Sequence, residues 1–157
     1  MKKIKWKTLL ISIAIPLIVG GLSALLTMDN MELFELVEKP PLSPPAWLFP
    51  VVWTILYVLM GISCYLVIEA QADQQSKTSA LVIYGLQLVF NFFWSIFFFN
   101  LEAYSFSFLW LVALLALIIL TAVKFGRICK AAGLLFIPYI IWVAFAGYLN
   151  AGIALLN

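Results

Sequence analysis

Residues 79–99 read Ser79-Ala-Leu-Val-Ile-Tyr-Gly-Leu-Gln-Leu-Val-Phe-Asn-Phe-Phe-Trp-Ser-Ile-Phe-Phe-Phe99 and contain no charged side chain. A run of this length matches the roughly 20 helical residues needed to cross a hydrocarbon core of about 30 Å. Four more uncharged apolar runs occur, at 8–26, 46–68, 105–123 and 132–156. The sequence therefore predicts an all-α integral membrane protein, a five-transmembrane-helix bundle.

The composition agrees with lipid as the main solvent. Hydrophobic residues make up 66% of the chain and charged residues 10%, whereas a soluble domain carries roughly 25% charged residues. Five crossings use up the 157 residues, so residues 1–157 are expected to form one domain. The net charge of +2 does not suggest a nucleic-acid partner, and the chain has no histidine. Cys64 and Cys129 lie in different predicted environments, so we expect neither a disulfide nor a metal site.

The basic residues are distributed unequally between the two ends of the predicted spans. Eight of the nine Lys and Arg residues fall on one side and one on the other. The positive-inside rule then places the N-terminus in the cytoplasm and the C-terminus outside. We expect a multi-pass protein of the cell membrane, with an organellar outer membrane as the alternative. The first run is read as a retained span rather than a cleaved signal peptide.

One connection is long, from about residue 27 to residue 45. Its second half reads Lys39-Pro-Pro-Leu-Ser-Pro-Pro45, which predicts an extended and stiff segment. Two interpretations stay open: a rigid connector, or a lid over an outward-facing cavity. Pro138 lies inside the fifth run and should bend or loosen that helix.

Polar and aromatic residues recur at helical spacing inside three of the runs. Side chains four residues apart share one helix face, and polar side chains in lipid face the bundle interior. They could be helix–helix contacts, or they could line a cavity for a flat, mostly apolar ligand. The residues are Trp53 and Tyr57 in the second run, Gln87, Asn91 and Ser95 beside Trp94 in the third, and Tyr139, Trp142, Ala146 and Asn150 in the fifth.

With these motifs, residues 34–150 resemble the translocator protein family, also called tryptophan-rich sensory proteins or peripheral-type benzodiazepine receptors. The resemblance is carried by three well-separated stretches in the family's order. They are Lys39-Pro40 with Pro44-Pro45-Ala46-Trp47 and Pro50-Val-Val-Trp-Thr-Ile-Leu-Tyr57, then Gln87-Leu-Val-Phe-Asn-Phe-Phe-Trp-Ser95, then Pro138-Tyr-Ile-Ile-Trp-Val-Ala-Phe145 with Leu149-Asn150.

The resemblance implies a homodimeric membrane receptor that binds porphyrins such as protoporphyrin IX, and synthetic drug ligands, with no required cofactor. Some family members also bind cholesterol, but the associated pattern needs a basic residue after Tyr148, and none follows. Porphyrin is therefore the main expected ligand. Carried over by position, the implied ligand-binding residues are Trp53, Tyr57, Phe90, Asn91, Trp94, Trp142, Ala144, Phe145 and Ala146.

Three functions remain open at this stage. The first is tetrapyrrole sensing or scavenging by binding. The second is an enzyme that degrades bound porphyrin with light and oxygen, in which Trp53 and Trp142 would be the catalytic electron donors. The third is a porphyrin or sterol transporter, which is disfavoured because the chain shows neither internal repeats nor charges within its spans.

Overall fold

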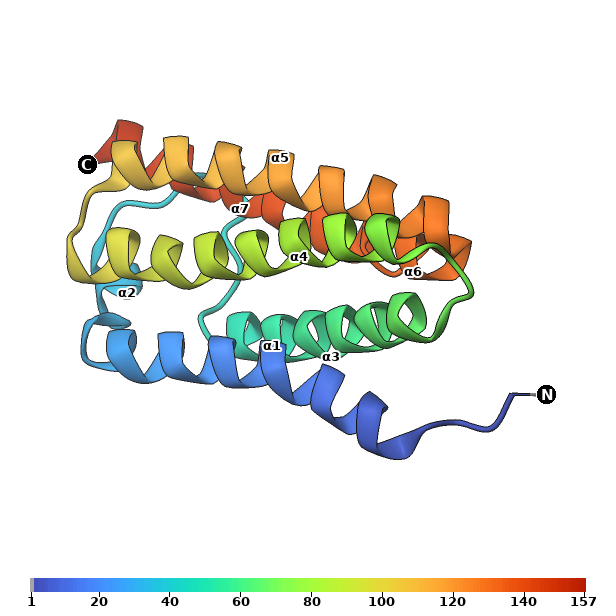
Figure 1. Cartoon of the computed structure of the whole chain (residues 1–157). Coiled ribbons are helices and arrows are strands. Elements are labelled where there is room, and N and C mark those ends of the chain that lie inside the picture. Colours follow the sequence, from blue (N-terminus) through green and yellow to red (C-terminus); the bar gives the residue numbers. More distant parts are fainter. Residues whose placement is uncertain (1) are drawn as a thin grey trace.

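The computed structural model describes residues 2–157, and the elements in this part of the chain are helices (Figure 1). In order they are α1 (Trp6–Thr27), the 3₁₀ turn η1 (Met28–Asn30), α2 (Leu33–Leu36), α3 (Leu48–Glu69), α4 (Gln74–Ser95), the π turn η2 (Ile96–Asn100), α5 (Tyr104–Ile128), α6 (Lys130–Leu134) and α7 (Ile137–Leu156).

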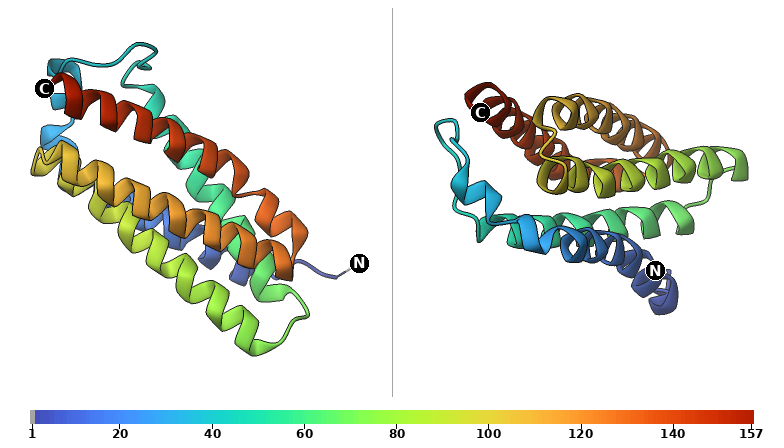
Figure 2. Two further views of the ribbon diagram at one scale, coloured as in Figure 1. Left: turned by 90° about the horizontal axis from the view of Figure 1, so that it is seen from above. Right: turned by 90° about the vertical axis from the view of Figure 1, so that its left-hand side faces the viewer.

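The long helices form two layers. α1 packs along α3 in one layer, while α4, α5 and α7 form the other, with α5 against both of its neighbours (Figures 1 and 2). The core lies between the layers and is rich in aromatic rings: Tyr84, Phe125, Phe136 and Tyr139 are all buried. Because the number of crossings is odd, the first residues and Asn157 lie at opposite ends of the bundle (Figure 1).

The five predicted spans are confirmed as five helical segments long and apolar enough to cross a membrane. Their ends differ from the sequence prediction at the basic end of the bundle. α4 begins at Gln74 rather than residue 79, because the Asp73 carboxylate caps it by accepting from the Ser76 N–H at 2.8 Å. α5 continues past residue 123 to Ile128. The apolar run predicts only the part of a helix that lies in lipid, and the helix itself continues beyond it into polar residues.

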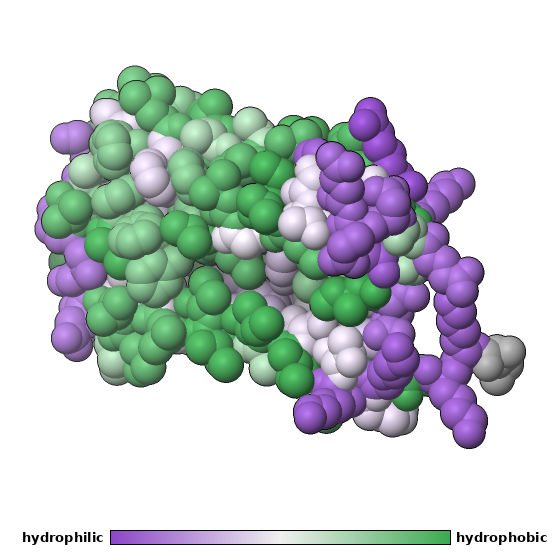
Figure 3. All heavy atoms as spheres, in the orientation of Figure 1, coloured by the Kyte–Doolittle hydropathy of each residue, from purple (hydrophilic) through white to green (hydrophobic). Residues whose placement is uncertain are grey.

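The outer surface confirms the lipid environment. Large apolar side chains such as Leu10, Ile18 and Leu25 on α1 are exposed around the bundle. Hydrophilic residues gather mainly at the end that carries the lysine-rich start of the chain (Figure 3). Helical backbone pairs its own N–H and C=O groups, as a segment in lipid must, and the ladder of α1 is interrupted at Pro16, which has no N–H.

Helix α1 approaches α3 closely at two glycines. A Cβ at Gly61 would lie 2.4 Å from the Ile13 Cα, and one at Gly20 would lie 2.2 Å from a ring carbon of Tyr57. At Gly61 the absence of a side chain lets the two helices pack nearly backbone to backbone, whereas at Gly20 it makes room for the Tyr57 ring.

Two irregularities interrupt the spans. The fifth span breaks at Leu135 and Phe136, between α6 and α7, with Pro138 in the first turn of α7, which confirms the expected local loosening. The third span ends in the π turn η2, where the Leu101 N–H reaches the Ile96 carbonyl at 3.1 Å. Such a wide turn rotates the side chains that follow it.

The first loop, residues 28–47, crosses the end of the bundle opposite the lysine-rich start. Its acidic half contains η1 and α2, while 39–45 is non-helical as predicted but turns at Leu42, where φ is 68°, instead of staying extended throughout. The loop is tied to α7. Tyr148 donates to the Pro41 carbonyl at 2.6 Å, and Asn157 and Glu38 exchange two hydrogen bonds.

Candidate functional site

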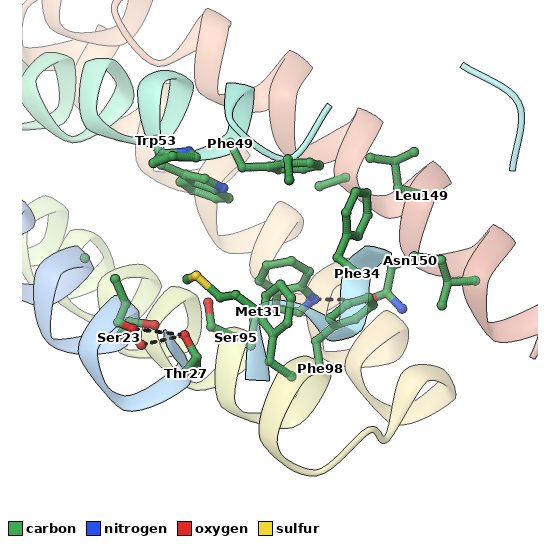
Figure 4. Close-up of a pocket in the computed structure, with 18 of the residues that line it drawn as sticks. Ser23, Thr27, Met31, Phe34, Phe49, Trp53, Ser95, Phe98, Leu149 and Asn150 are labelled. Atoms are coloured by element: carbon green, nitrogen blue, oxygen red, sulfur yellow. Dashed lines mark hydrogen bonds between the residues drawn. The ribbon is translucent and has the colours of Figure 1, made fainter. Parts of the chain in front are cut away.

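A cavity of about 260 Å³ lies between the two layers, beneath the first loop (Figure 4). Side chains from α1, the loop, α3, α4, η2 and α7 line it. No charged side chain of the described chain is among them, and most of the wall is apolar. The lining comprises Gly20, Ser23, Ala24, Thr27, Met31, Phe34, Ala46, Phe49, Pro50, Trp53, Tyr57, Trp94, Ser95, Phe98, Phe99, Ala146, Leu149, Asn150 and Ile153.

Aromatic rings make up much of the wall of this cavity. Trp53 stacks on Tyr57 one helical turn away, with ring centres 5.7 Å apart and an interplanar angle of 27°. Across the cavity Trp94 stacks on Phe98 at 5.5 Å. Phe34 from the loop meets Phe49 edge to face at 5.0 Å. Extended aromatic surfaces of this kind suit a flat apolar ligand.

A buried chain of hydrogen bonds lies directly behind the Tyr57 ring. The Tyr57 hydroxyl donates to Asn91 Oδ1 at 3.1 Å, and Asn91 Nδ2 donates to the Tyr139 hydroxyl at 2.6 Å. Tyr139 then donates to Gln87 Oε1 at 2.8 Å. Three helices are thereby joined through side chains that would be costly to leave unpaired in lipid.

Asn150 organises a second polar cluster at the cavity wall. Its Oδ1 accepts from Trp94 Nε1 at 3.0 Å and from the Ser107 hydroxyl at 3.1 Å, while its Nδ2 donates to the Tyr104 carbonyl at 2.9 Å. The Trp94 indole, which lines the cavity, is thereby held with its N–H bonded to Asn150, which is labelled in Figure 4.

The structure brings four of the nine sequence-predicted site residues to the cavity surface: Trp53, Tyr57, Trp94 and Ala146. Asn91 lies one layer behind, where its side chain holds Tyr57. These five occupy the inward faces that the spacing of four residues had indicated.

The other four lie off the cavity surface. Phe90 stacks on Trp110, with ring centres 4.1 Å apart, on the side of α4 that faces α5. The Trp110 indole therefore packs against protein, and its N–H donates to the Phe90 carbonyl. Ala144 is exposed, and Phe145 packs against Tyr148. Trp142 meets the cavity residue Phe49 edge to face at 5.7 Å, and its buried Nε1 has no acceptor within residues 2–157.

Sequence reasoning missed the contribution of α1 and the loop. Gly20, Ser23 and Thr27 line the cavity, and their spacing of three and four residues within an apolar run was a usable signal. Phe49 did carry the signal, because it lies four residues before Trp53 in the same run. Phe34 carried no comparable signal, because the path of the loop determines where it lies.

No group of three or more acidic, cysteine or histidine side chains suited to a metal occurs in the described part of the chain. The groups that the cavity presents to a ligand are aromatic faces, the Asn150 amide and hydroxyls such as that of Ser95.

Comparison with known proteins identifies the family. The TspO/MBR family model matches residues 12–156. The chain belongs to the TspO/MBR family. The tryptophan-rich protein TspO of Archaeoglobus fulgidus is 38% identical over 150 residues, covering 95% of this chain and 96% of that protein. The tryptophan-rich protein TspO of Chlorobaculum tepidum is 38% identical, covering 79% and 78%. The translocator protein of Ovis aries is 31% identical, covering 78% and 73%.

Membership of the TspO/MBR family confirms the resemblance seen in the sequence. The matched region includes all five spans of this TspO/MBR protein apart from the first turns of α1, and it includes the whole first loop and every residue that lines the cavity. The cavity is thus built entirely from the part of the chain that defines the family.

Proposed function

We propose that this TspO/MBR protein binds porphyrin-type tetrapyrroles in the cavity beneath the first loop, and that it serves tetrapyrrole sensing or scavenging. The observation that carries the proposal is the uncharged cavity walled by the stacked pairs Trp53–Tyr57 and Trp94–Phe98. Synthetic ligands with fused aromatic rings would use the same surfaces.

A porphyrin also carries acidic side chains, and a cation stands near the mouth of the cavity. The Lys39 ammonium lies 4.7 Å above the Phe34 ring and donates to the Phe34 carbonyl at 2.8 Å. A propionate directed outward from the cavity would reach this ammonium while the macrocycle stays among the aromatic rings. A metal-free porphyrin suits the site better than haem, because the chain has no histidine to act as an axial ligand.

Binding of a macrocycle requires the first loop to move. The cavity of about 260 Å³ lies just below the range of small-molecule sites, which run from about 300 to 1,000 Å³. The loop is held to α7 by exposed hydrogen bonds, such as Tyr148 to Pro41 and Glu38 to Asn157, and by apolar contacts of Pro40 with Gly152 and of Phe34 with Ile153. Exposed bonds exchange with water at little net cost, so opening the loop as a lid would cost mainly these apolar contacts.

Titration with protoporphyrin IX in detergent micelles tests the proposal through quenching of tryptophan fluorescence. We expect saturable quenching, and weaker binding for Trp53→Phe than for Trp6→Phe, since Trp6 is exposed at the far end of α1. Lys39→Gln should weaken binding of the free diacid more than that of its dimethyl ester. Linear, non-saturating quenching for the wild-type protein would refute binding in the cavity.

A second candidate function is light- and oxygen-dependent breakdown of the bound porphyrin. Trp53 favours it, because this indole lines the cavity and stacks on Tyr57, whose hydroxyl is hydrogen-bonded to Asn91. An electron lost from Trp53 to a photoexcited porphyrin could be replaced from this neighbouring phenol. Trp53→Phe should then slow degradation under light at saturating porphyrin, while Trp142→Phe changes it less. Equal rates in both variants and wild type would exclude the indole role.

The orientation in the cell membrane belongs to the same proposal. With the N-terminus in the cytoplasm, the first loop and the cavity mouth face outward. Cysteine labelling of intact cells checks this: with both native cysteines replaced by serine, Leu42→Cys should react with an impermeant maleimide and Lys3→Cys should not.

A further inference from the structure

A second, polar cavity lies at the opposite end of the bundle from the first loop. It has a volume of about 450 Å³ and is formed where the α3–α4 connection and the first turns of α4 meet the last turns of α5. Its walls are Gln71, Ala72, Asp73, Gln75, Ser76, Ser79, Lys124, Arg127 and Ile128. Nothing in the proposed porphyrin function uses it.

Two cations reach this cavity from consecutive turns of α5. Lys124 Nζ donates to the neutral Ser79 hydroxyl at 2.9 Å. Arg127 is exposed and forms neither a hydrogen bond nor an ion pair with another described residue. The salt bridge found within residues 2–157 joins Lys5 to Glu69 instead. Both cationic groups in the cavity therefore lack an anionic partner.

One acid also lines the cavity, but it is already engaged. The Asp73 carboxylate accepts from the Ser76 N–H at 2.8 Å and from the Ser76 hydroxyl at 2.9 Å. These bonds fix it against the start of α4. Two positive side chains against one occupied carboxylate leave the cavity with a net positive charge.

The depth of the cavity indicates which anion reaches it. The uncharged run of α5 ends at Val123, immediately before Lys124, so the cavity lies where lipid headgroups begin. Exposed apolar side chains continue directly below on the two helices that form it: Val82 on α4, and Leu120 and Val123 on α5. They offer a path for acyl chains beneath a headgroup held above.

We propose that this cavity binds the phosphate headgroup of an anionic phospholipid. Arg127 and Lys124 take the phosphate oxygens, because guanidinium pairs with phosphate through two parallel hydrogen bonds and ammonium acts as a point charge. The side-chain amides of Gln71 and Gln75 donate to the polar remainder of the headgroup. General attraction between basic helix ends and acidic membranes, by contrast, would not depend on the residues that line this cavity.

Native mass spectrometry of the detergent-solubilised protein tests the proposal, with phosphatidylglycerol and phosphatidylcholine as probes. We expect one phosphatidylglycerol adduct that outlasts phosphatidylcholine adducts at equal lipid concentration. Arg127→Gln should lower its affinity by about tenfold or more, the loss expected for hydrogen bonds to a charged group. Lys130→Gln is the matched control: it removes an exposed cation at the same end that does not line the cavity, and general electrostatics predicts about fivefold or less.

Two further experiments distinguish a lipid from a soluble phosphate and control for misfolding of the variants. Arg127→Lys keeps the charge and should recover part of the affinity, which a folding defect would not allow. Glycerol phosphate at millimolar concentration should fail to displace the lipid. Equal losses in Arg127→Gln and Lys130→Gln, equal retention of both lipids, or displacement by glycerol phosphate would each overturn the proposal.

Discussion

Asn91 holds Tyr57 and Tyr139 at the same time, accepting from one hydroxyl at 3.1 Å and donating to the other at 2.6 Å. Its single amide thus joins α3, α4 and α7 behind the cavity wall. Tyr57 is a wall residue, so the position of the cavity surface depends on a side chain that does not reach it.

Replacement of Asn91 should destabilise the protein more than removal of the Tyr57 hydroxyl. Asn91→Leu removes the acceptor of Tyr57 and a donor to Tyr139, and we expect a loss of about 1–3 kcal/mol in the free energy of unfolding. Tyr57→Phe removes one hydrogen bond and should cost about 1 kcal/mol. Unfolding by SDS in mixed micelles measures both. Gln74→Ala, an exposed amide on the same helix outside both cavities, is the control, and an equal effect there would argue against the network.

Adjacent glycines of α1 should respond in opposite ways to alanine. A methyl group at Gly20 would lie 2.2 Å from the Tyr57 ring, whereas at Gly21 it would meet no described atom within 4 Å. Gly20→Ala should cost about 1–3 kcal/mol by forcing Tyr57 away from Trp53. Gly21→Ala should leave stability unchanged or raise it by up to about 1 kcal/mol, since alanine favours helix. Thermal unfolding in micelles compares them; equal shifts would show that α1 moves freely relative to α3.

Leu42 should tolerate glycine better than valine. Its φ of 68° is costly for a side chain with a Cβ, and it is 85% exposed at the turn closed by the Ser43 hydroxyl on the Pro40 carbonyl. Leu42→Gly removes that strain, of about 1–2 kcal/mol, but adds freedom to the unfolded loop, so stability should change little. Leu42→Val places a branched side chain in the same conformation and should destabilise the loop. Limited proteolysis of residues 37–45 ranks the variants, and a more resistant valine variant would contradict the backbone argument.

Stability should depend on acid pH through Asp73. The hydrogen bonds from Ser76 hold the pKa of the Asp73 carboxyl below its ordinary value. A depressed pKa in the folded state contributes stability that is fully present above the unfolded pKa, about 3.9, and is lost as the pH falls through the folded pKa. The gap in stability between wild type and Asp73→Ala should therefore be constant near neutral pH and shrink below about pH 4.

Ser76→Ala gives a graded check on the same site. It removes the hydroxyl donor but keeps the backbone N–H, so the gap to wild type should be smaller than for Asp73→Ala and should shrink over the same pH range. If the difference in stability between wild type and Ser76→Ala widened as the pH fell, the pKa of Asp73 could not be lowered by folding.

The sequence was sufficient for the bundle and for the inward faces. Uncharged runs of about 20 residues have one inexpensive conformation in lipid, and a spacing of four placed Trp53 with Tyr57 and Gln87 with Asn91. The sequence was not sufficient to place residues that are adjacent in the chain to those on the inward faces. Phe90 directly precedes Asn91, and one residue turns a helix by about 100°, so its ring points to Trp110 instead.

The remaining cavity wall depended on contacts between distant segments. Phe34 reaches the cavity because the loop is tied to α7, through bonds such as Glu38 to Asn157. Those partners are 119 residues apart and carry no periodic signal. The π turn was equally hidden, since no residue type in Ile96–Asn100 requires it.

That π turn gives the third crossing one residue more than a regular helix would use. Deleting Phe97 would let the segment close as an ordinary α-helix instead of unwinding it, because the wide turn already holds the surplus. Phe98 would then lie three residues from Trp94 instead of four, which would change how the two rings stack at the cavity wall. Loss of a single codon here would therefore change the shape of the cavity while the helix bundle stays intact. Evolution could change the ligand preference of the protein in this way.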